Sequence, residues 1–467
     1  MTMRSALLTL LLLPNIAFPQ EVQAPKRIAD DHHAVYDNDL LSPEFHRGRR
    51  DALRASLPEG GVAIFFAAPV RNRSNDVDYE YHQDPNFYYL TGLREPEALL
   101  FVFKEPRMIA GESTTELLVV QDRDPREEVW NGKRPGPAEA KELLGVAMTM
   151  GAHQFKNTEF PWRQADALYH HRVEEPRNDP HSSTDLADLL DHLEATAPVG
   201  QQNGPADIRR WMAELRELKT EEELVLMRRA IEITCEAQKE LMRKLEPNMT
   251  EYQTEAIVEY VFKTNGAEHE GFPSIQGGGP HSCVLHYTTN RRTLVDGDLL
   301  VSDIGAEYHG YTADVTRTMP ANGRFTKDQR AIYDLVLAAQ DAGIAQVRAG
   351  NAFRDPHTAA WNVIVKGMKD LGIIKAEDEL RRYFMHGTSH YLGLDVHDAG
   401  TYGPLKAGNV ITVEPGIYIA KDSPCDPRWW GIGVRIEDDI LVTEGDPVNL
   451  SGCAPRKADE VEALMTE

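Results

Sequence analysis

The sequence predicts an α/β N-terminal domain followed by a larger α+β C-terminal domain. A length of 467 residues exceeds one average domain, and a composition of 41% hydrophobic and 27% charged residues is typical of globular proteins. Up to about residue 200, short apolar runs alternate with helix-like segments. Beyond that point, two pairs of helix-like segments are each followed by a strand-rich stretch. The two patterns differ enough to predict two domains.

Residues 1–24 are predicted to be a secretory signal peptide. One arginine precedes an apolar run at residues 6–13, and Pro14 follows that run. The run is much shorter than the roughly 20 residues that a membrane-spanning helix needs. The mature protein is therefore expected to be exported, either periplasmic or secreted, and to have no membrane partner once the signal is removed.

The N-terminal domain is expected over residues 43–200. Apolar runs predict buried strands, and amphipathic segments predict helices between them. The strands are expected at residues 60–70, 98–103 and 115–124, and the helices at 137–146 and 184–197. This alternation predicts a small doubly wound sheet. It contains neither GxGxxG nor a phosphate-binding loop, so no nucleotide site is implied.

The C-terminal domain is expected over residues 210–450. Thr220 and Glu223 form a capping-box pattern that predicts the start of a long helix. Further helices are expected at residues 250–264, 326–349 and 354–372, with strands at 284–319 and 383–443. The order is helix pair, strands, helix pair, strands. Two such halves would bring distant motifs together on one sheet surface.

Composition argues against two kinds of site. The formal net charge is −24, with 74 acidic and 50 basic residues, and such a surface repels phosphate backbones, so no nucleic-acid partner is expected. The four cysteines lack metal-site spacing. Cys425 and Cys453 lie in polar stretches and could form a disulfide in an oxidising compartment, whereas Cys235 falls on an apolar helix face and is interpreted as a core residue.

Five residues stand where a charge is normally penalised. Each lies in a short apolar or glycine-rich stretch: Asp303, Asp314, His390, Glu414 and Glu437. An unpaired carboxylate buried there costs several kcal/mol. The basic residues in these stretches are Arg317 and Arg435, which cannot neutralise four carboxylates. One or two divalent cations would balance the remaining charge, so the cluster predicts a metal-dependent enzyme.

Asp303 and Asp314 are separated by a predicted tight turn at residues 307–310. If the two strands pair antiparallel, the carboxylates can face one another across the pair and hold a hard cation. The alternative interpretation makes Asp314 a helix cap or an ion-pair partner of Arg317.

Three histidines stand within twelve residues among small glycines: His386, His390 and His397. A lone histidine is more often a core residue than a ligand, but this density favours function. No glutamate follows His386 in the HExxH spacing, so a thermolysin-type zinc site is not supported. One imidazole as ligand and two as substrate-binding or proton-shuttling groups is the interpretation we favour.

Glu414 and Glu437 complete the acidic set. Pro415 forces extended backbone at Glu414. Strand alternation places Arg435 on the face of Glu437, where it could orient a carboxylate ligand, although Glu437 alone could be a surface residue. Carboxylate-rich ligation with a single histidine favours Mn²⁺ over Zn²⁺. Two such ions can generate a nucleophile from water while a glutamate relays the proton.

At these residues the chain resembles the Xaa-Pro aminopeptidases of the pita-bread metallopeptidase family. The resemblance is carried by DIGAEYHGYTADVTRT, HGTSHYLGLDVHD, TVEPGIY, GIGVRIEDD and the upstream VLHYTTN. In the N-terminal domain, QDPNFYYLTGLREPEALL and WNGKRPG are similar to segments of the same family. The resemblance covers roughly residues 43–450, and it implies a pita-bread catalytic domain.

The resemblance also implies a role for each site residue. Asp314 and Glu437 would bridge two ions, usually manganese. Asp303 would hold one ion, and His390 with Glu414 the other. Glu414 would transfer a proton, His286 and His397 would bind substrate and shuttle protons, and His386 would line the proline pocket. Arg435 and Tyr418 would support the ligands.

In activity, the resemblance implies removal of the N-terminal residue from peptides whose second residue is proline. The alternative is a prolidase, which has the same site but cleaves only Xaa-Pro dipeptides. A non-enzymatic peptide-binding module is a further alternative, which the filled ligand positions oppose. A homo-oligomer, dimer or tetramer, is implied, but Tyr88 stands where the family has a tryptophan directed at a neighbouring subunit. That departure weakens the expectation that a second subunit completes the site.

Overall fold

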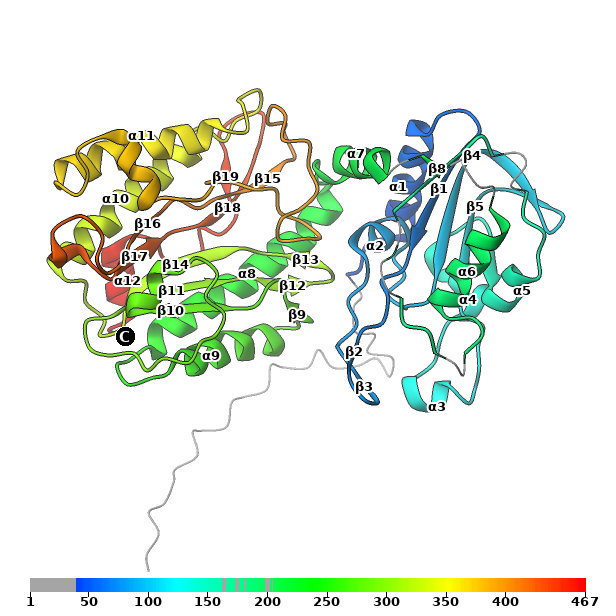
Figure 1. Ribbon diagram of the computed structural model, residues 1–467, viewed down its shortest axis with the longest axis horizontal. Helices are drawn as coiled ribbons and strands as arrows, with labels where there is room; N and C mark the ends of the chain where they lie inside the picture. Colours follow the sequence, from blue (N-terminus) through cyan, green and yellow to red (C-terminus); the bar gives the residue numbers. More distant parts are fainter. Residues whose placement is uncertain are drawn as a thin grey trace, which may run out of the picture. The chain divides into compact units, whose positions relative to one another are not determined.

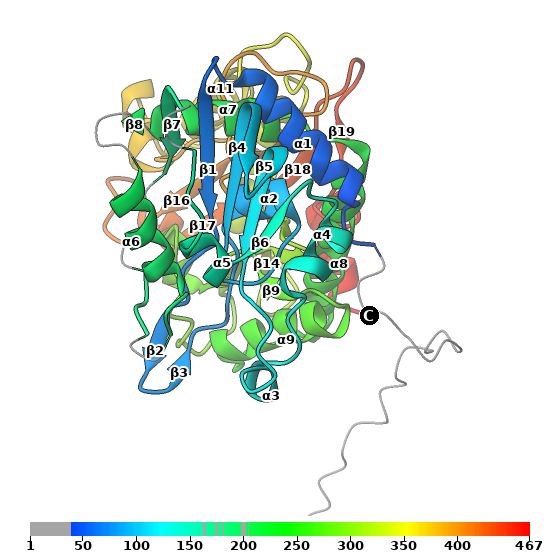
Figure 2. The same ribbon diagram turned by 90° about the vertical axis from the view of Figure 1, so that its right-hand side faces the viewer.

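A six-stranded mixed sheet forms the centre of the N-terminal part (Figures 1 and 2). The computed structural model describes residues 39–161, 165–171, 173, 176–179, 182–197, 202–203 and 205–467. The strand order is β6-β5-β4-β1-β7-β8, with bounds β1 Gly61–Phe66, β4 Leu99–Ile109, β5 Glu112–Val120, β6 Thr149–Gly151, β7 Ala167–His170 and β8 Gln202–Asn203. β1, β4 and β5 pair antiparallel and coincide with the three predicted strands, whereas β6, β7 and β8 join by parallel pairing.

Both faces of this sheet are buried, which is why its strands read as continuous apolar runs rather than as alternating ones. Ala63 and Phe65 of β1 belong to an apolar cluster with helices α1 (Pro43–Ser56), α2 (Pro85–Thr91) and α7 (Pro205–Arg216). Val62 and Ile64 belong to the opposite cluster, with α5 (Ala152–Lys156) and α6 (Leu186–Thr196). The smaller elements of this part are β2 (Asn72–Ser74), β3 (Val77–Asp78), α3 (Glu128–Asn131) and α4 (Gly136–Leu144).

Two helix pairs organise the C-terminal part, as the sequence predicts. The helices are α8 Glu221–Lys244, α9 Glu251–Thr264, α10 Lys327–Ile344 and α11 Asp355–Asp370, with a short α12 at Ala458–Leu464. The Thr220–Glu223 capping box is present, and equivalent boxes begin α9 and α10. Because each box satisfies backbone N–H groups that the first helical turn leaves without partners, helix starts are the most predictable boundaries here.

Antiparallel sheets lie between the two helix pairs (Figure 1). One sheet has the order β10-β11-β14 and another β15-β18-β19, while β16 pairs with β17 and β13-β12-β9 forms a small outer sheet. The bounds are β9 His269–Glu270, β10 Ile275–Gly278, β11 Leu299–Ile304, β12 Ala306–Tyr308, β13 Tyr311–Thr312, β14 Val315–Pro320, β15 Val410–Val413, β16 Gly416–Ile419, β17 Ile432–Arg435, β18 Asp438–Leu441 and β19 Val448–Asn449. Separate apolar clusters bind α8 and α9 to β11 and β14, and α10 and α11 to β16 and β17.

The segment of residues 383–409 is not the strand region that the sequence predicts. It is mostly irregular and joins the sheet at one bridge, between Tyr391 and Ile411. Side-chain hydrogen bonds, rather than strand pairing, fix this segment: Asp398 accepts hydrogen bonds from Arg216 and from Lys219. Glycines and short polar residues in this segment favour such a loop over a strand.

The disulfide links Cys235 to Cys453, so the pairing of Cys425 with Cys453 that the sequence left open does not form, and Cys235 is more than a core residue. Cys235 on α8 is buried, and the loop that carries Cys453 packs against α8 through Ala454. Cys425 lies instead against the α10–α11 cluster and is a free thiol, as is Cys283. Two cysteines in polar loops of similar composition can lie on different faces, which sequence alone does not reveal.

Side-chain contacts join the two parts, and residues Leu41–Glu467 form a single compact unit. Apolar residues of α1, α2 and α7 share one cluster with Tyr311 and Leu394 of the C-terminal part. The predicted signal peptide lies outside the described residues. Within the described ranges, no helix combines the length and the apolar character needed to cross a membrane.

Candidate metal centre

One pocket of about 480 Å³ collects the five predicted metal ligands together with the three further histidines and Arg435. Its walls include Asp303, Asp314, His390, Glu414, Glu437, His286, His386, His397 and Arg435. They come from the loop after η2 (Gly279–Cys283), from β11, the residue before β14 and the irregular segment after η3 (Glu377–Arg382), and from the ends of β15 and β17 and the residues just beyond them. Apolar side chains including Phe272, Ile275 and Leu285 also line the pocket, so the charged floor is set among apolar surface.

Asp303 and Asp314 belong to two neighbouring antiparallel segments, but they are not directly opposite one another in the strand pairing. Asp303 lies opposite Thr316, and Asp314 precedes β14. The tight turn sits at His309 and Gly310, which both have positive φ. The alternative partner for Asp314 is excluded, because Arg317 binds Asp438 at 2.7 Å instead.

Three ligand atoms converge on one point. One ligand atom each from Asp314, His390 and Glu437 lie within 4.8 Å of one another, and all three residues are buried. The buried oxygens Asp303 Oδ1, Asp314 Oδ1 and Glu437 Oε1 have no hydrogen-bond partner. Buried polar atoms are nearly always satisfied, so three orphaned carboxylate oxygens in one pocket fit a site built for cations.

Crowding of negative charge perturbs these carboxyl groups. Burial, and next the charge of Asp303, holds the pKa of Asp314 well above its usual range. Burial, and next the charge of Asp314, does the same to the pKa of Glu437. Burial raises the pKa of Glu414 to about 7, despite the opposing effect of His390. A bound cation would reverse the sign of the local field and favour the ionised carboxylates.

His390 is oriented as a ligand by its backbone surroundings. Its Nδ1 donates to the carbonyl oxygen of Tyr391 at 3.0 Å, which leaves Nε2 with a lone pair in the neutral ring. Nε2 lies 3.4 Å from Asp314 Oδ2 and 3.8 Å from Glu414 Oε1. A hydrogen bond from the ring nitrogen that does not bind the metal commonly fixes the tautomer of a metal-binding histidine.

Arg435 connects the acidic floor to the histidine wall. Its Nη2 donates to Asp303 Oδ2 at 2.6 Å, so it does orient a carboxylate, and its Nη1 donates to the hydroxyl of Tyr418 at 2.9 Å. That hydroxyl lies 2.8 Å from His386 Nε2. His386 Nδ1 donates to Gly387 O at 2.7 Å, and burial lowers the pKa of His386 to about 4, so the ring is neutral and fixed.

His286 and His397 line the pocket on exposed segments. The ring centroid of His397 lies 4.2 Å from that of His390. Both side chains are therefore placed to meet a ligand that enters from solvent. Neither needs to move to reach the pocket.

Sequence analysis predicted Arg435 as a supporting residue but missed two others, Thr316 and Asp439. Thr316 Oγ1 donates to Glu437 Oε2 at 2.7 Å, and the N–H of Asp314 donates to Asp439 Oδ2 at 3.2 Å. Both missed residues stand two positions after a predicted ligand. Strand alternation places such residues on the same face, so period two was the available signal.

Comparison with known proteins identifies the family. The sequence pattern of "Metallopeptidase family M24" matches residues 225–444, and that of "Aminopeptidase P, N-terminal domain" matches residues 46–165. The Xaa-Pro aminopeptidase of Escherichia coli is 38% identical over 448 residues, covering 92% of this chain and 98% of that protein. The chain belongs to metallopeptidase family M24. It combines an α/β N-terminal domain with the α+β pita-bread domain of the M24 family.

Solved M24 structures agree over nearly the whole chain. Aminopeptidase P from E. coli with the inhibitor Pro-Leu has a TM-score of 0.82 at 36% identity, covering 91% of this chain and 99% of that one. Zn-substituted E. coli aminopeptidase P in complex with product has a TM-score of 0.81 at the same identity and coverage. As an M24 metallopeptidase, this chain carries a group of residues that could hold a metal ion, Asp314, His390 and Glu437.

Proposed function

We propose that this protein removes the N-terminal residue from peptides whose second residue is proline. The observation that carries the proposal is the convergence of four carboxylates and one imidazole on a single pocket, in a chain whose relative of 38% identity is an Xaa-Pro aminopeptidase. The substrate partners are proline-containing peptides, and the reaction is hydrolysis of the first peptide bond.

The metal is proposed to be Mn²⁺, two ions per subunit. Asp314 and Glu437 would bridge the ions, Asp303 would complete one site, and His390 with Glu414 the other. Four carboxylates with a single imidazole form a harder donor set than most zinc sites use, which supports manganese. When bound, such ions supply a nucleophile from water at neutral pH and polarise the scissile carbonyl group.

The chain's own residues would orient the substrate and move the proton. Glu414 is the proposed proton carrier, because its carboxylate lines the pocket with Oε1 3.8 Å from His390 Nε2, where it can take up a proton and pass it to the leaving group. His286 and His397 would hold the peptide at the pocket mouth. His386, with both ring nitrogens engaged, would present a fixed ring against the proline, and Arg435 would keep Asp303 in position.

The tripeptide Arg-Pro-Pro tests the reaction. Release of free arginine from Mn²⁺-loaded protein supports the proposal. Cleavage confined to Xaa-Pro dipeptides would instead identify a prolidase. No bound metal after dialysis, together with no activity on adding Mn²⁺, would favour a peptide-binding module.

The working compartment is proposed to be outside the cytoplasm. The apolar run at residues 6–13 and the Cys235–Cys453 disulfide support export, since disulfides persist in oxidising compartments. Fusion of residues 1–24 to a reporter enzyme tests this, and a reporter retained in the cytoplasm would contradict it. A homo-oligomer, dimer or tetramer, is also proposed, and light scattering measures it.

A further inference from the structure

Residues 450–456 form a loop that the Cys235–Cys453 disulfide ties to α8. We call these residues the C-terminal loop. The disulfide joins two positions that are 218 residues apart in the sequence. Cys235 is buried in α8, whereas Cys453 is exposed. The bond therefore prevents the loop from leaving the helix, although one of its two cysteines is open to solvent.

The disulfide lies behind the segment that carries the ligand Asp314. Ala313 and Val315, which flank Asp314 in the sequence, belong to the same apolar cluster as Cys235 and Ala454. All four cluster residues are at most 1% exposed. In an extended segment, neighbouring side chains point to opposite faces. One face of this segment therefore lines the metal pocket, and the other packs against the disulfide and the C-terminal loop.

Arg317 joins the C-terminal loop to the segment that carries Glu437. Its side chain is fully buried. The guanidinium donates hydrogen bonds to the carbonyl oxygens of Pro455 and Ala454 in the loop, both at 2.9 Å. It also donates to the carbonyl oxygen of Glu437 at 2.6 Å and to Asp438 Oδ1 at 2.7 Å. One side chain thus holds the loop and the backbone of a predicted bridging ligand together.

Ser451 makes a second connection from the loop to the ligands. Its hydroxyl donates to Asp438 Oδ1 at 2.7 Å and accepts the N–H of Asp439 at 3.0 Å. Asp439 Oδ2 in turn accepts the N–H of Asp314 at 3.2 Å. The C-terminal loop therefore reaches both predicted bridging ligands through hydrogen bonds, but it supplies none of the residues that line the metal pocket.

Burial makes the contacts of Arg317 necessary. A buried charged donor that loses its acceptors keeps the cost of its desolvation. If the C-terminal loop opened, Arg317 would lose the carbonyl oxygens of Pro455 and Ala454. The backbone of Glu437 would then be bound to a guanidinium that is no longer held from the side of the loop. The loop must stay closed for Arg317 to fix the ligand.

We propose that Arg317 is a positioning residue of the metal centre and that the Cys235–Cys453 disulfide locks it in place, so that reduction of the disulfide weakens metal binding. Arg317 acts through the backbone of Glu437 and touches no metal. The protein then binds its metal most tightly in an oxidising compartment. This inference rests on the proposed metal centre, but it does not depend on which peptide is cleaved.

Reduction of the disulfide needs a dithiol. One thiolate of the dithiol attacks the sulfur of Cys453, the exposed partner, and Cys235 leaves as a thiolate that takes up a proton. The second thiolate of the dithiol then releases Cys453 as a thiol and closes a disulfide within the reductant. Two electrons and two protons pass from the dithiol to the two cysteines.

The first test compares the Mn²⁺ affinity of the oxidised and the reduced full chain by calorimetry, with the dithiol removed under anaerobic conditions. We expect the reduced protein to bind Mn²⁺ about tenfold more weakly, the lower end of the usual loss for a group that positions a ligand. Excess Mn²⁺ should restore the activity of the reduced protein, since its ligands are intact. Equal affinity in the two states would overturn the proposal.

Cysteine variants test the disulfide itself. Cys453→Ser should bind Mn²⁺ as weakly as the reduced protein does, with or without the dithiol, and serine loses little packing at this exposed position. Cys425→Ser is the matched control, because it removes a free thiol and leaves the disulfide. It should keep both the wild-type affinity and the dependence on reduction. Wild-type affinity in Cys453→Ser would contradict the proposed role of the disulfide.

Arg317→Lys and Arg50→Lys form a matched pair. Arg50 is also fully buried, and it binds the carboxylate of Glu116 at 3.0 Å and the carbonyl oxygens of Leu90 and Gly145, all in the N-terminal domain. Both variants should be less stable than the wild type in chemical denaturation. Only Arg317→Lys should also lose Mn²⁺ affinity, by about 10- to 100-fold. An equal loss of affinity in the two variants would show that Arg317 has a structural role alone.

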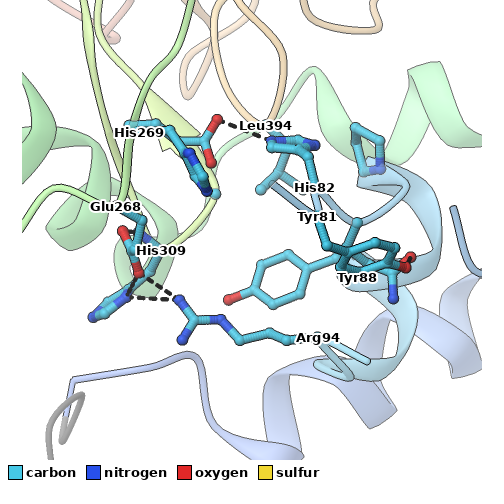
Figure 3. Close-up of a pocket in the computed structure, with 12 residues that line it drawn as sticks. Tyr81, His82, Tyr88, Arg94, Glu268, His269, His309 and Leu394 are labelled. Atoms are coloured by element: carbon cyan, nitrogen blue, oxygen red, sulfur yellow. Dashed lines mark hydrogen bonds and ion pairs between the residues drawn. The ribbon is translucent and has the colours of Figure 1, made fainter. Parts of the chain in front are cut away.

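A further control loosens the protein at a distance from the C-terminal loop. Figure 3 shows Arg94 of the N-terminal domain pointing toward Glu268 and His309 of the catalytic domain, in a pocket to which the loop contributes no residue. Arg94→Ala should leave the Mn²⁺ affinity and its dependence on reduction unchanged. If Arg94→Ala weakens Mn²⁺ binding as much as reduction does, general loosening is the cause and the proposal is overturned.

The outcomes also separate this inference from the proposed function. A fall in Mn²⁺ affinity on reduction, in a protein that cleaves no Xaa-Pro peptide, would support the positioning role and overturn the proposed activity. Full activity with an affinity that ignores reduction would do the reverse. No Mn²⁺ binding in either state would overturn both the metal centre and its proposed support. If Arg317→Lys fails to fold, the comparison of Cys453→Ser with Cys425→Ser still decides the question.

Discussion

The metal pocket and the joint between the two domains, which is formed by Arg216, Lys219 and Asp398, both bury charged side chains. They differ in how the negative charge is balanced. In the metal pocket, Asp303, Asp314, Glu414 and Glu437 share one guanidinium, that of Arg435. In the joint, Asp398 accepts hydrogen bonds from Arg216 and, at 2.6 Å, from Lys219. All three side chains of the joint are at most 3% exposed.

The difference shows in the pKa of each acid. Burial raises the pKa of Asp398, but the charges of Arg216 and Lys219 more than offset it and hold that pKa below the usual range. Burial and neighbouring carboxylates hold the pKa of Asp314 well above its range. Buried acids with built-in cations are structural, whereas buried acids without them require a cation from solution.

The largest expected effect comes from Asp314→Asn. Losing this ligand should lower kcat/KM about a thousandfold, the rate equivalent of roughly 4 kcal/mol of transition-state stabilisation. The metal-free variant should be at least as stable as the metal-free wild type, because one source of repulsion has gone. Kinetics and chemical denaturation measure the two quantities. Retained turnover would refute the ligand assignment.

Asp398→Asn should have the opposite effect on stability. Removing one partner leaves Arg216 and Lys219 buried without compensation, so the free energy of unfolding should fall by about 3–5 kcal/mol. Denaturation of the metal-free form isolates this effect from metal binding. If Asp314→Asn and Asp398→Asn destabilise the protein equally, the distinction between the two clusters fails.

Metal removal should affect the pocket and leave the joint unchanged. After chelation, activity should be lost, and restoring Mn²⁺ at a hundred times its Kd should raise the free energy of unfolding by about 2.7 kcal/mol. Protons compete with the metal for groups whose pKa is raised, so affinity should be weaker at pH 6 than at pH 8, on either side of the pKa of about 7 at Glu414. Calorimetry should detect proton release. An affinity that does not change with pH would contradict this account.

Arg435→Lys should have the smallest effect. Lysine cannot hold both Asp303 and Tyr418 as the guanidinium does, so kcat/KM should fall about 10- to 100-fold, the usual cost of losing a group that orients a ligand. Tyr418→Phe, which removes one of the two contacts, is the matched control and should lose less. Full activity in Arg435→Lys would show that Asp303 needs no orienting partner.

Local pattern was sufficient to predict much of the fold. Capping residues at Thr220, Thr250 and Thr326 mark helix starts, and continuous apolar runs mark β1, β4 and β5. These signals are carried by neighbouring residues, so they survive without tertiary context. The segment at 383–409 was predicted as strand because loop anchors such as Lys219 lie far away in the sequence.

The same division applies to the site. Charges in apolar surroundings singled out the five predicted ligands, because the desolvation cost of each can be read from its sequence neighbours. The density of histidines pointed to His386 and His397, whereas His286 was identified by the family resemblance alone. The supporting residues Thr316 and Asp439 were overlooked, although period two was available as a signal. The cysteine pairing stayed open in the sequence because it depends on which face of α8 the C-terminal loop covers.

By itself, the sequence determined the residue types of the metal centre, the class of chemistry and the helix starts. The first two follow from the energetic cost of burying charge in apolar stretches, and the helix starts follow from hydrogen bonds between neighbouring residues. Only the tertiary structure decided which carboxylate oxygens lack hydrogen-bond partners and how Arg435 links Asp303 to Tyr418. Those properties depend on contacts between segments that are distant in the sequence, such as Asp303 and Arg435, which are 132 positions apart and which only packing brings together.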